Sequence, residues 1–240
     1  MNEVQNIDCC GQLVLLPGDF RQLQRNPEDP ADSAVFGKQT EGTSCFLVIF
    51  PNDFSKAMPF EDDKSIAEEI HRKLGEKQGL IEIVSRRDKN GHECVYTVVK
   101  TLKKPSGVQY NLTMQIRYPK RLLQIQGFFD EGRTTGIRDA MVLELAMRTG
   151  QIHQGSLNGW SKDPFDENYK NGIPRNLSES EEYDQLFPDH PLSVLRRTVR
   201  TILQLPEPEN LKEESDSPDD VPTWSPLDYV LDDTDKPLWN

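Results

Sequence analysis

Short apolar segments in the first fifth of the chain predict β-strands. Residues 45–51 give the strongest early signal, because a run of apolar, β-branched and aromatic residues stops at a proline. Residues 11–17 follow the same pattern and end at a Pro-Gly pair, and residues 34–38 form a further candidate strand. The pattern therefore predicts three strands before the first helix.

Four longer strand-like segments follow one another in the middle of the chain. They are separated by Asn90-Gly91, by a Pro-Ser-Gly sequence and by Pro119-Lys120, which all favour turns. Strands joined by short turns are usually neighbours in a sheet. The four segments are residues 80–86, 93–102, 109–118 and 122–130. Together they predict an antiparallel meander.

Apolar residues at helical spacing predict helices on either side of this meander. The first helix follows residue 65, the second covers residues 135–149 and the third begins at Pro191. We expect the apolar side of each to pack inward, and that of the second to cover the sheet. These sides comprise Ile66, Ile70 and Leu74; Ile137, Met141, Val142 and Leu145; and Leu192, Leu195, Val199 and Ile202. The fold class predicted is α+β, with a mainly antiparallel sheet flanked by helices.

The pattern also predicts three regions along the chain. Residues 1–150 form the α+β domain, and residues 151–205 form an arm rich in aromatic and acidic residues that leads into a C-terminal helix packing on the domain. Residues 206–240 lose all periodicity and contain recurrent prolines, which exclude a continuous helix or central strand. This last region is the acidic tail.

Charge separates the tail from the rest of the chain. The chain has a net charge of −12, and residues 206–240 hold eleven acidic residues against two lysines. Residues 1–159 are nearly balanced, with 21 acidic and 20 basic residues. An acidic chain without a basic stripe repels phosphate backbones, so nucleic acid is not an expected partner.

No stretch approaches the roughly 18 to 20 apolar residues of a membrane span, and the first residues lack the basic and apolar parts of a secretory signal. We therefore expect a cytoplasmic protein without a membrane partner. The four cysteines are few and irregularly spaced, which favours free thiols over a disulfide framework.

Several segments resemble a known superfamily. They are LVLLPGDF at residues 13–20, FLVIFPNDF at residues 46–54, the meander, and GFFDEGRTTGIRD at residues 127–139. In their order along the first 150 residues they resemble the Mog1/PsbP-like α/β/α sandwich, whose members include a Ran-binding protein, photosystem proteins and many bacterial proteins of unknown role. The resemblance implies a binding scaffold that lacks a shared active site, and a likeness of fold does not assign a function.

The turn before the second helix is a candidate anion site. Arg133, Thr134, Thr135 and Arg138 lie where a strand gives way to a helix, and a helix N-terminus with guanidinium groups can hold an anion. The alternative is structural. In that case the glycines form the turn, Thr134 or Thr135 caps the helix, and neighbouring acids neutralise the arginines.

The arm and the tail are candidate contact surfaces for a protein partner. In the arm, Trp160, Phe165 and Tyr169 either line a groove or fold the arm back over the domain. In the tail, an apolar and aromatic segment lies between acidic stretches, as in many short docking motifs. Its anchors are Trp224, Leu227 and Tyr229. Docking, packing on the chain's own domain and an inert tail are the alternatives, and the tryptophan favours docking.

No catalytic, metal or cofactor motif accompanies these candidates. The acidic run at residues 163–167 lacks the glycine and ligand spacing of a calcium loop, and no zinc pair or nucleophile elbow is present. The absence favours a non-enzymatic role and leaves the question open. The hypothesis is a cytoplasmic protein-interaction module of adaptor, chaperone-like or immunity type. The alternative is an enzyme or small-molecule binder with an anion pocket at residues 132–138.

Overall fold

The computed structural model describes residues 3–30, 32–132, 134–153 and 155–205, which belong to one compact unit, Met1–Pro206. The predicted anion-site residue Arg133 and the tail anchors Trp224, Leu227 and Tyr229 lie outside the described residues. All counts of strands and helices refer to the described residues of this unit.

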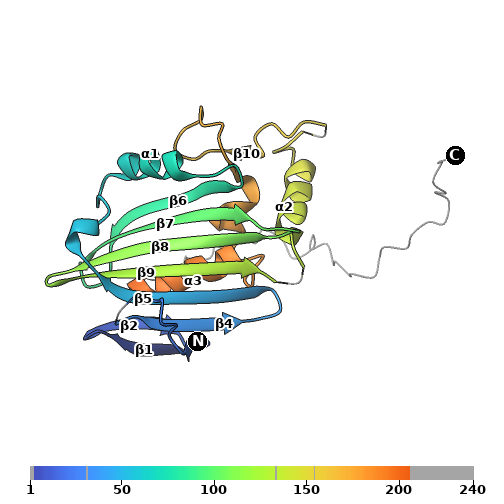
Figure 1. Ribbon diagram of the computed structural model, residues 1–240. Coiled ribbons are helices and arrows are strands. Elements are labelled where there is room, and N and C mark those ends of the chain that lie inside the picture. Colours follow the sequence, from blue (N-terminus) through green and yellow to red (C-terminus); the bar gives the residue numbers. More distant parts are fainter. Residues whose placement is uncertain (1–2, 31, 133, 154, 206–240) are drawn as a thin grey trace, which may run out of the picture. The chain divides into compact units, whose positions relative to one another are not determined.

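A seven-stranded antiparallel sheet forms the centre of the unit, in the order β3-β4-β5-β9-β8-β7-β6 (Figure 1). Its strands are β3 (Arg21–Leu23), β4 (Ala34–Gln39), β5 (Thr43–Asn52), β6 (Gln78–Arg87), β7 (Glu93–Leu102), β8 (Val108–Tyr118) and β9 (Arg121–Glu131). The predicted four-stranded meander is confirmed, because β6 to β9 pair in sequence order. Strand β9 then pairs with β5, which places the early strands on the other side of the meander.

Two small hairpins accompany this sheet. β1 (Val4–Cys9) pairs with β2 (Gln12–Pro17), and the short strands β10 (Ser161–Lys162) and β11 (Arg175–Asn176) pair within the arm. The sequence pattern predicts β2 and does not predict β1, whose side chains are mostly polar and exposed or half-buried.

Three α-helices surround the sheet (Figure 1). They are α1 (Asp63–Lys73), α2 (Ile137–Arg148) and α3 (Pro191–Leu203), and three 3₁₀ turns are η1 (Phe54–Lys56), η2 (Leu177–Glu179) and η3 (Glu181–Tyr183). Helix α3 begins as its sequence suggests, since Pro191 occupies the first turn and the His190 side chain accepts a hydrogen bond from the Leu192 N–H.

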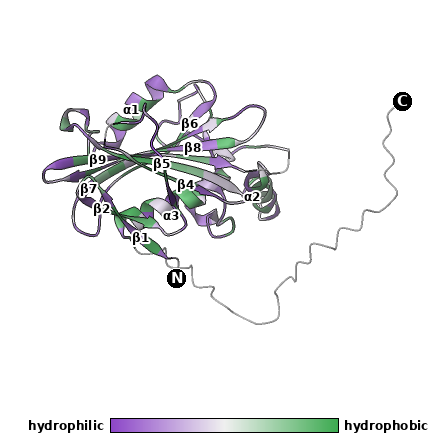
Figure 2. Cartoon of the chain, turned by 60° about the horizontal axis from the view of Figure 1, so that its bottom comes forward, coloured by the Kyte–Doolittle hydropathy of each residue, from purple (hydrophilic) through white to green (hydrophobic). Residues whose placement is uncertain are grey.

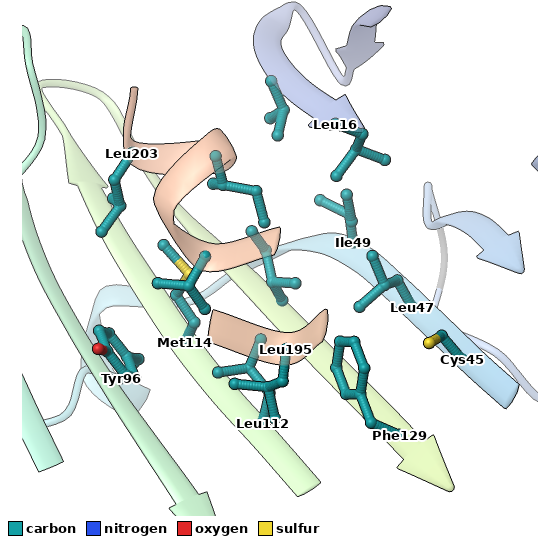
Figure 3. Packing of buried hydrophobic residues seen from close by; sticks show 14 of the residues in the cluster. Leu16, Cys45, Leu47, Ile49, Tyr96, Leu112, Met114, Phe129, Leu195 and Leu203 are labelled. Carbon is teal, nitrogen blue, oxygen red and sulfur yellow. The ribbon is translucent and has the colours of Figure 1, made fainter. Parts of the chain in front are cut away.

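Helices α1 and α3 pack on opposite faces of the sheet. Side chains alternate between faces along a strand, so the adjacent residues Val95 and Tyr96 of β7 point in opposite directions. Tyr96 belongs to the large core beneath α3, and Val95 to a smaller cluster beneath α1. The predicted apolar side of α3 is confirmed, because all four of its residues are buried in the large core; Figure 3 shows part of this packing.

The orientation predicted for α2 is wrong. Three of the residues expected to cover the sheet are instead exposed, at 48% for Ile137, 55% for Met141 and 42% for Leu145. The buried side carries Arg138, Val142 and Ala146. This side of the helix faces inward because Arg138 donates hydrogen bonds to the Ser178 and Ser180 carbonyls of the arm.

Candidate functional site

The junction between α2, the arm and α3 is organised around one buried arginine. Arg138 is 1% exposed, and its N–H groups point to acceptors of the protein. Nε donates to the Ser178 carbonyl at 2.6 Å, and Nη2 donates to the Ser180 carbonyl at 3.0 Å and to Asp184 Oδ1 at 2.9 Å. Nη1 donates to Ser193 Oγ at 2.8 Å and lies 3.5 Å from His190 Nδ1. All five N–H groups of the guanidinium thus have a protein acceptor nearby.

Asp184 connects this arginine to a second one on α3. Its Oδ1 accepts from Arg196 Nη1 at 2.8 Å as well as from Arg138, and Arg196 Nε donates to Glu82 Oε1 at 2.7 Å. Arg196 is also buried, and the carboxylates beside it raise its pKa despite its burial. Through these contacts, the two arginines and Asp184 link α2, the arm, α3 and β6.

A third buried pair joins the same arm to the sheet. Lys100 Nζ on β7 donates to Glu179 Oε2 at 2.8 Å, and the Tyr110 hydroxyl on β8 donates to Glu179 Oε1 at 3.0 Å. Each of these buried charges faces an opposite charge, and Glu179 also accepts from Tyr110 and from the Asn176 N–H, which helps to make the buried ions tolerable. The network holds α2 and the arm in place.

A carboxylate of the chain itself occupies the N-terminus of α2. Glu131 accepts hydrogen bonds from the Gly136 N–H at 3.2 Å and from the Val108 N–H at 2.9 Å, and its Oε1 lies 3.6 Å from His190 Nε2. Burial acts to raise the pKa of Glu131, but these hydrogen bonds outweigh it and hold the pKa below its ordinary value. Glu131 is therefore an anion already bound at the helix start.

The predicted anion-site residues are placed as follows. The N–H groups of Arg138 donate hydrogen bonds to other residues of the protein. Thr134 is exposed and Thr135 is half-buried. The cap of α2 is Gly136, with φ of 76° and no side-chain hydrogen bond, so the expectation of a threonine cap is wrong. Because Arg133 lies outside the described residues, the anion-site hypothesis stays a prediction.

The exposed side of α2 presents an apolar ridge. We define the α2 ridge as Ile137, Met141 and Leu145, which lie at spacing four on one side of the helix (Figure 2 colours much of α2 as hydrophobic). At its first residue the ridge meets a concavity of about 210 Å³, also lined by Phe187 and Pro188 of the arm. The concavity adjoins the ridge at Ile137, and its lining also includes polar residues such as Glu131 and His190.

The arm residues predicted to bind a partner do not form one groove. Tyr169 stacks on His71 of α1, with ring centroids 3.9 Å apart, and its hydroxyl donates to the His71 carbonyl at 3.1 Å. Phe165 lines a different cavity, between β6 and α3. Trp160 is half-buried, and its backbone carbonyl accepts from the Leu177 N–H at 2.7 Å. Packing of the arm therefore accounts for much of this aromatic content.

The ligand chemistry available to the described residues is limited. No group of three or more His, Cys, Asp or Glu side chains in that part of the chain is arranged to hold a metal ion. Burial raises the pKa of the Cys9, Cys45 and Cys94 thiols to about 12, so these three remain protonated at neutral pH. Within the described ranges, no helix has the length and apolar character needed to cross a membrane.

The sequence pattern identifies the residues of the α2 ridge as an apolar side of the helix and predicts that they pack inward. The signal that distinguishes the two sides is weak, because Val142 and Ala146 make a second apolar line one position further along the helix. The sequence around Arg138 does not indicate its burial, because its acceptors lie 40 or more residues away in sequence.

Within the described residues, the fold is an α+β unit with a seven-stranded antiparallel sheet and three α-helices. No protein-family model matches the chain, and no curated protein matches it. Solved structures do match. A mutant form of the protein Mog1 is similar over 84% of this chain and 94% of its own, with 9% identity and a TM-score of 0.41.

Two further structures are similar over 63% of this chain. The Ran-binding protein Mog1p of Saccharomyces cerevisiae is covered to 85%, with 9% identity and a TM-score of 0.38. The cyanobacterial PsbP protein of Synechocystis is covered to 91%, with 15% identity and a TM-score of 0.37. The matches to Mog1 and PsbP are those the sequence resemblance predicts. At such identities and scores they concern the fold alone and carry no argument about function.

Proposed function

We propose that this chain is a non-enzymatic protein-interaction module and that the α2 ridge is its contact surface. The observation that carries the proposal is the exposure of Ile137, Met141 and Leu145 on a helix whose other side is held by buried ion pairs. Three exposed apolar side chains over about 12 Å of helix are a typical anchor set for a groove in another protein. A ridge on a fixed helix loses little conformational entropy on binding.

The chemistry around the ridge indicates an apolar partner surface. The charged side chains nearby on α2, Glu144 and Arg148, pair with each other at 2.6 Å, so they add no net charge beside the ridge. In the adjoining concavity, Phe187 and Pro188 add apolar side chains next to polar lining residues. We therefore propose that the partner presents an uncharged apolar groove rather than a basic or acidic patch.

The proposed role in the cell is that of an adaptor, chaperone-like or immunity-type protein in the cytoplasm. The tail anchors Trp224, Leu227 and Tyr229 would add a second point of attachment in this scheme. Two attachment points on one chain raise the overall affinity without new contacts at either.

Site-specific photo-crosslinking in cells of the source organism tests the assignment. A photoreactive residue at position 141 should give a discrete adduct with a different protein. The control position is Lys120, an exposed turn residue between β8 and β9. The same adducts from both positions, or adducts only between two copies of this chain, would contradict the proposal.

A further inference from the structure

A second candidate site lies beside β6, the edge strand of the sheet opposite to β3. A cavity of about 380 Å³ opens between β6, α3 and the arm, which is a size typical of small-molecule sites. Its apolar lining includes Ile81, Val84 and Val199, and Phe165 of the arm also lines it. This cavity shares no lining residue with the α2 ridge.

The cavity is rich in arginine. Four guanidinium groups line it, and two carboxylates, Glu82 and Glu181, face them. Each carboxylate is already paired: Glu82 with Arg196, and Glu181 with Arg200 Nη1 at 2.8 Å. The lining therefore carries an excess of two positive charges, from Arg86 and Arg175.

These two arginines have donors to offer a ligand. Arg175 uses Nη2 for the Glu179 carbonyl at 3.3 Å, which leaves most of its N–H groups uncommitted within the described part of the chain. Arg86 is exposed and makes no hydrogen bond or ion pair with a described residue. A guanidinium group presents its N–H groups in a fixed fork that matches phosphate and carboxylate oxygens.

Tyr96 supplies a third donor from the floor of the cavity. Its side chain is 7% exposed and lines the cavity, and its hydroxyl has no hydrogen-bond partner among the described residues. Figure 3 shows the hydroxyl oxygen turned away from Leu195 and the rest of the core. Burial, together with the charge of Glu82, raises the pKa of Tyr96, so the hydroxyl keeps its proton at neutral pH. At the cavity, solvent or a ligand can accept the hydrogen bond that this hydroxyl offers.

We propose that this cavity binds the phosphate group of a small phosphate monoester. Arg86 and Arg175 neutralise its two negative charges, and the Tyr96 hydroxyl donates a hydrogen bond to a phosphate oxygen. The ester's organic part lies against Phe165 and the apolar lining of β6 and α3. A phosphate matches the excess charge of two, which a single carboxylate does not.

Titration calorimetry of the full chain tests the proposal, with phenyl phosphate, inorganic phosphate and benzoate as probes. Phenyl phosphate should bind saturably and more tightly than inorganic phosphate, because only the ester reaches the apolar lining. Benzoate should bind more weakly than phenyl phosphate. Absence of saturable phenyl phosphate binding, or equal affinity for benzoate, would overturn the proposal.

Three variants locate the site. Arg86→Gln and Tyr96→Phe should each raise the dissociation constant for phenyl phosphate about tenfold, the usual effect of losing one charge-assisted hydrogen bond. The matched control is Arg87→Gln, the next residue of β6, whose side chain points to the opposite face and pairs with Glu93 at 3.3 Å. Wild-type affinity in Arg86→Gln, or an equal loss in Arg87→Gln, would overturn the assignment. The binding needs no protein partner, so its failure is independent of the α2 ridge.

Discussion

Arg138 of α2 and Asp184 of the arm form a buried ion pair, with Nη2 and Oδ1 2.9 Å apart and the two residues 46 positions apart in sequence. The pair fixes which side of α2 faces inward. It therefore also decides that Ile137, Met141 and Leu145 face outward. A contact in the interior thus determines the composition of the exposed surface.

Replacing the buried arginine should destabilise the protein strongly. Arg138→Met leaves two arm carbonyls without their donor and removes one of the two arginines that pair with Asp184. Breaking a buried pair on one side costs roughly 3 to 5 kcal/mol. Urea unfolding followed by circular dichroism measures the loss. The control is Arg148→Gln on the exposed side of the same helix, which should change the free energy of unfolding by less than about 1 kcal/mol. Equal losses in the two variants would contradict the role given to Arg138.

The same substitution at two neighbouring positions of α2 should have very different effects on the free energy of unfolding. Met141→Asp places a charge at an exposed site and should change the free energy of unfolding by less than about 0.5 kcal/mol. Val142→Asp places an unpaired charge in a buried site and should cost roughly 3 kcal/mol or more. Chemical denaturation of both variants decides the point. A large loss in Met141→Asp would show that the ridge is part of the core.

Stability should fall in acid partly through Glu131. Its folded-state pKa lies below the ordinary value of 4.5, because hydrogen bonds from His190, Gly136 and Val108 outweigh the effect of burial. The folded state therefore binds fewer protons than the unfolded state in acid. The resulting stabilisation is complete above the ordinary pKa and is lost as the pH falls through the folded-state pKa.

The measurement is the free energy of unfolding of wild type and Glu131→Gln as the pH is lowered. The difference between them should shrink from its neutral-pH value as Glu131 becomes protonated. A difference that stays constant from about pH 7 to about pH 3 would contradict the lowered pKa of Glu131.

Thiol reactivity should distinguish the four cysteines. Burial raises the pKa of Cys9, Cys45 and Cys94 to about 12, whereas Cys10 is half-buried in the turn between β1 and β2. Ellman's reagent at about pH 8 should label one thiol per native chain rapidly, and all four after denaturation. Rapid labelling of two or more thiols in the native protein would contradict this packing.

Local patterns account for most of the fold that the sequence predicts. The meander follows from strand-like runs separated by turn residues such as Asn90-Gly91, and α3 follows from Pro191 and a single apolar side. Each of these signals lies within about fifteen residues of the element that it specifies. The sequence does not predict β1, because its mostly polar residues give no strand pattern and the strand forms by pairing with β2.

The candidate sites depend on contacts between distant segments, which no local pattern contains. Arg138 is buried because Ser178, Ser180 and Asp184 surround it, and the sequence around residue 138 does not indicate them. The cavity at Tyr96 is likewise formed by strands, α3 and the arm together. In both places the side-chain types are visible in the sequence, and their partners become visible only in the folded chain.

Binding of the crosslinked partner to Met141→Asp tests the central claim, that the α2 ridge is the contact surface, most directly. Removing the apolar contact of one ridge residue and adding a charge should weaken binding at least about tenfold, with the free energy of unfolding unchanged. Isothermal titration calorimetry with the purified partner measures this. A dissociation constant within about twofold of wild type would contradict the account.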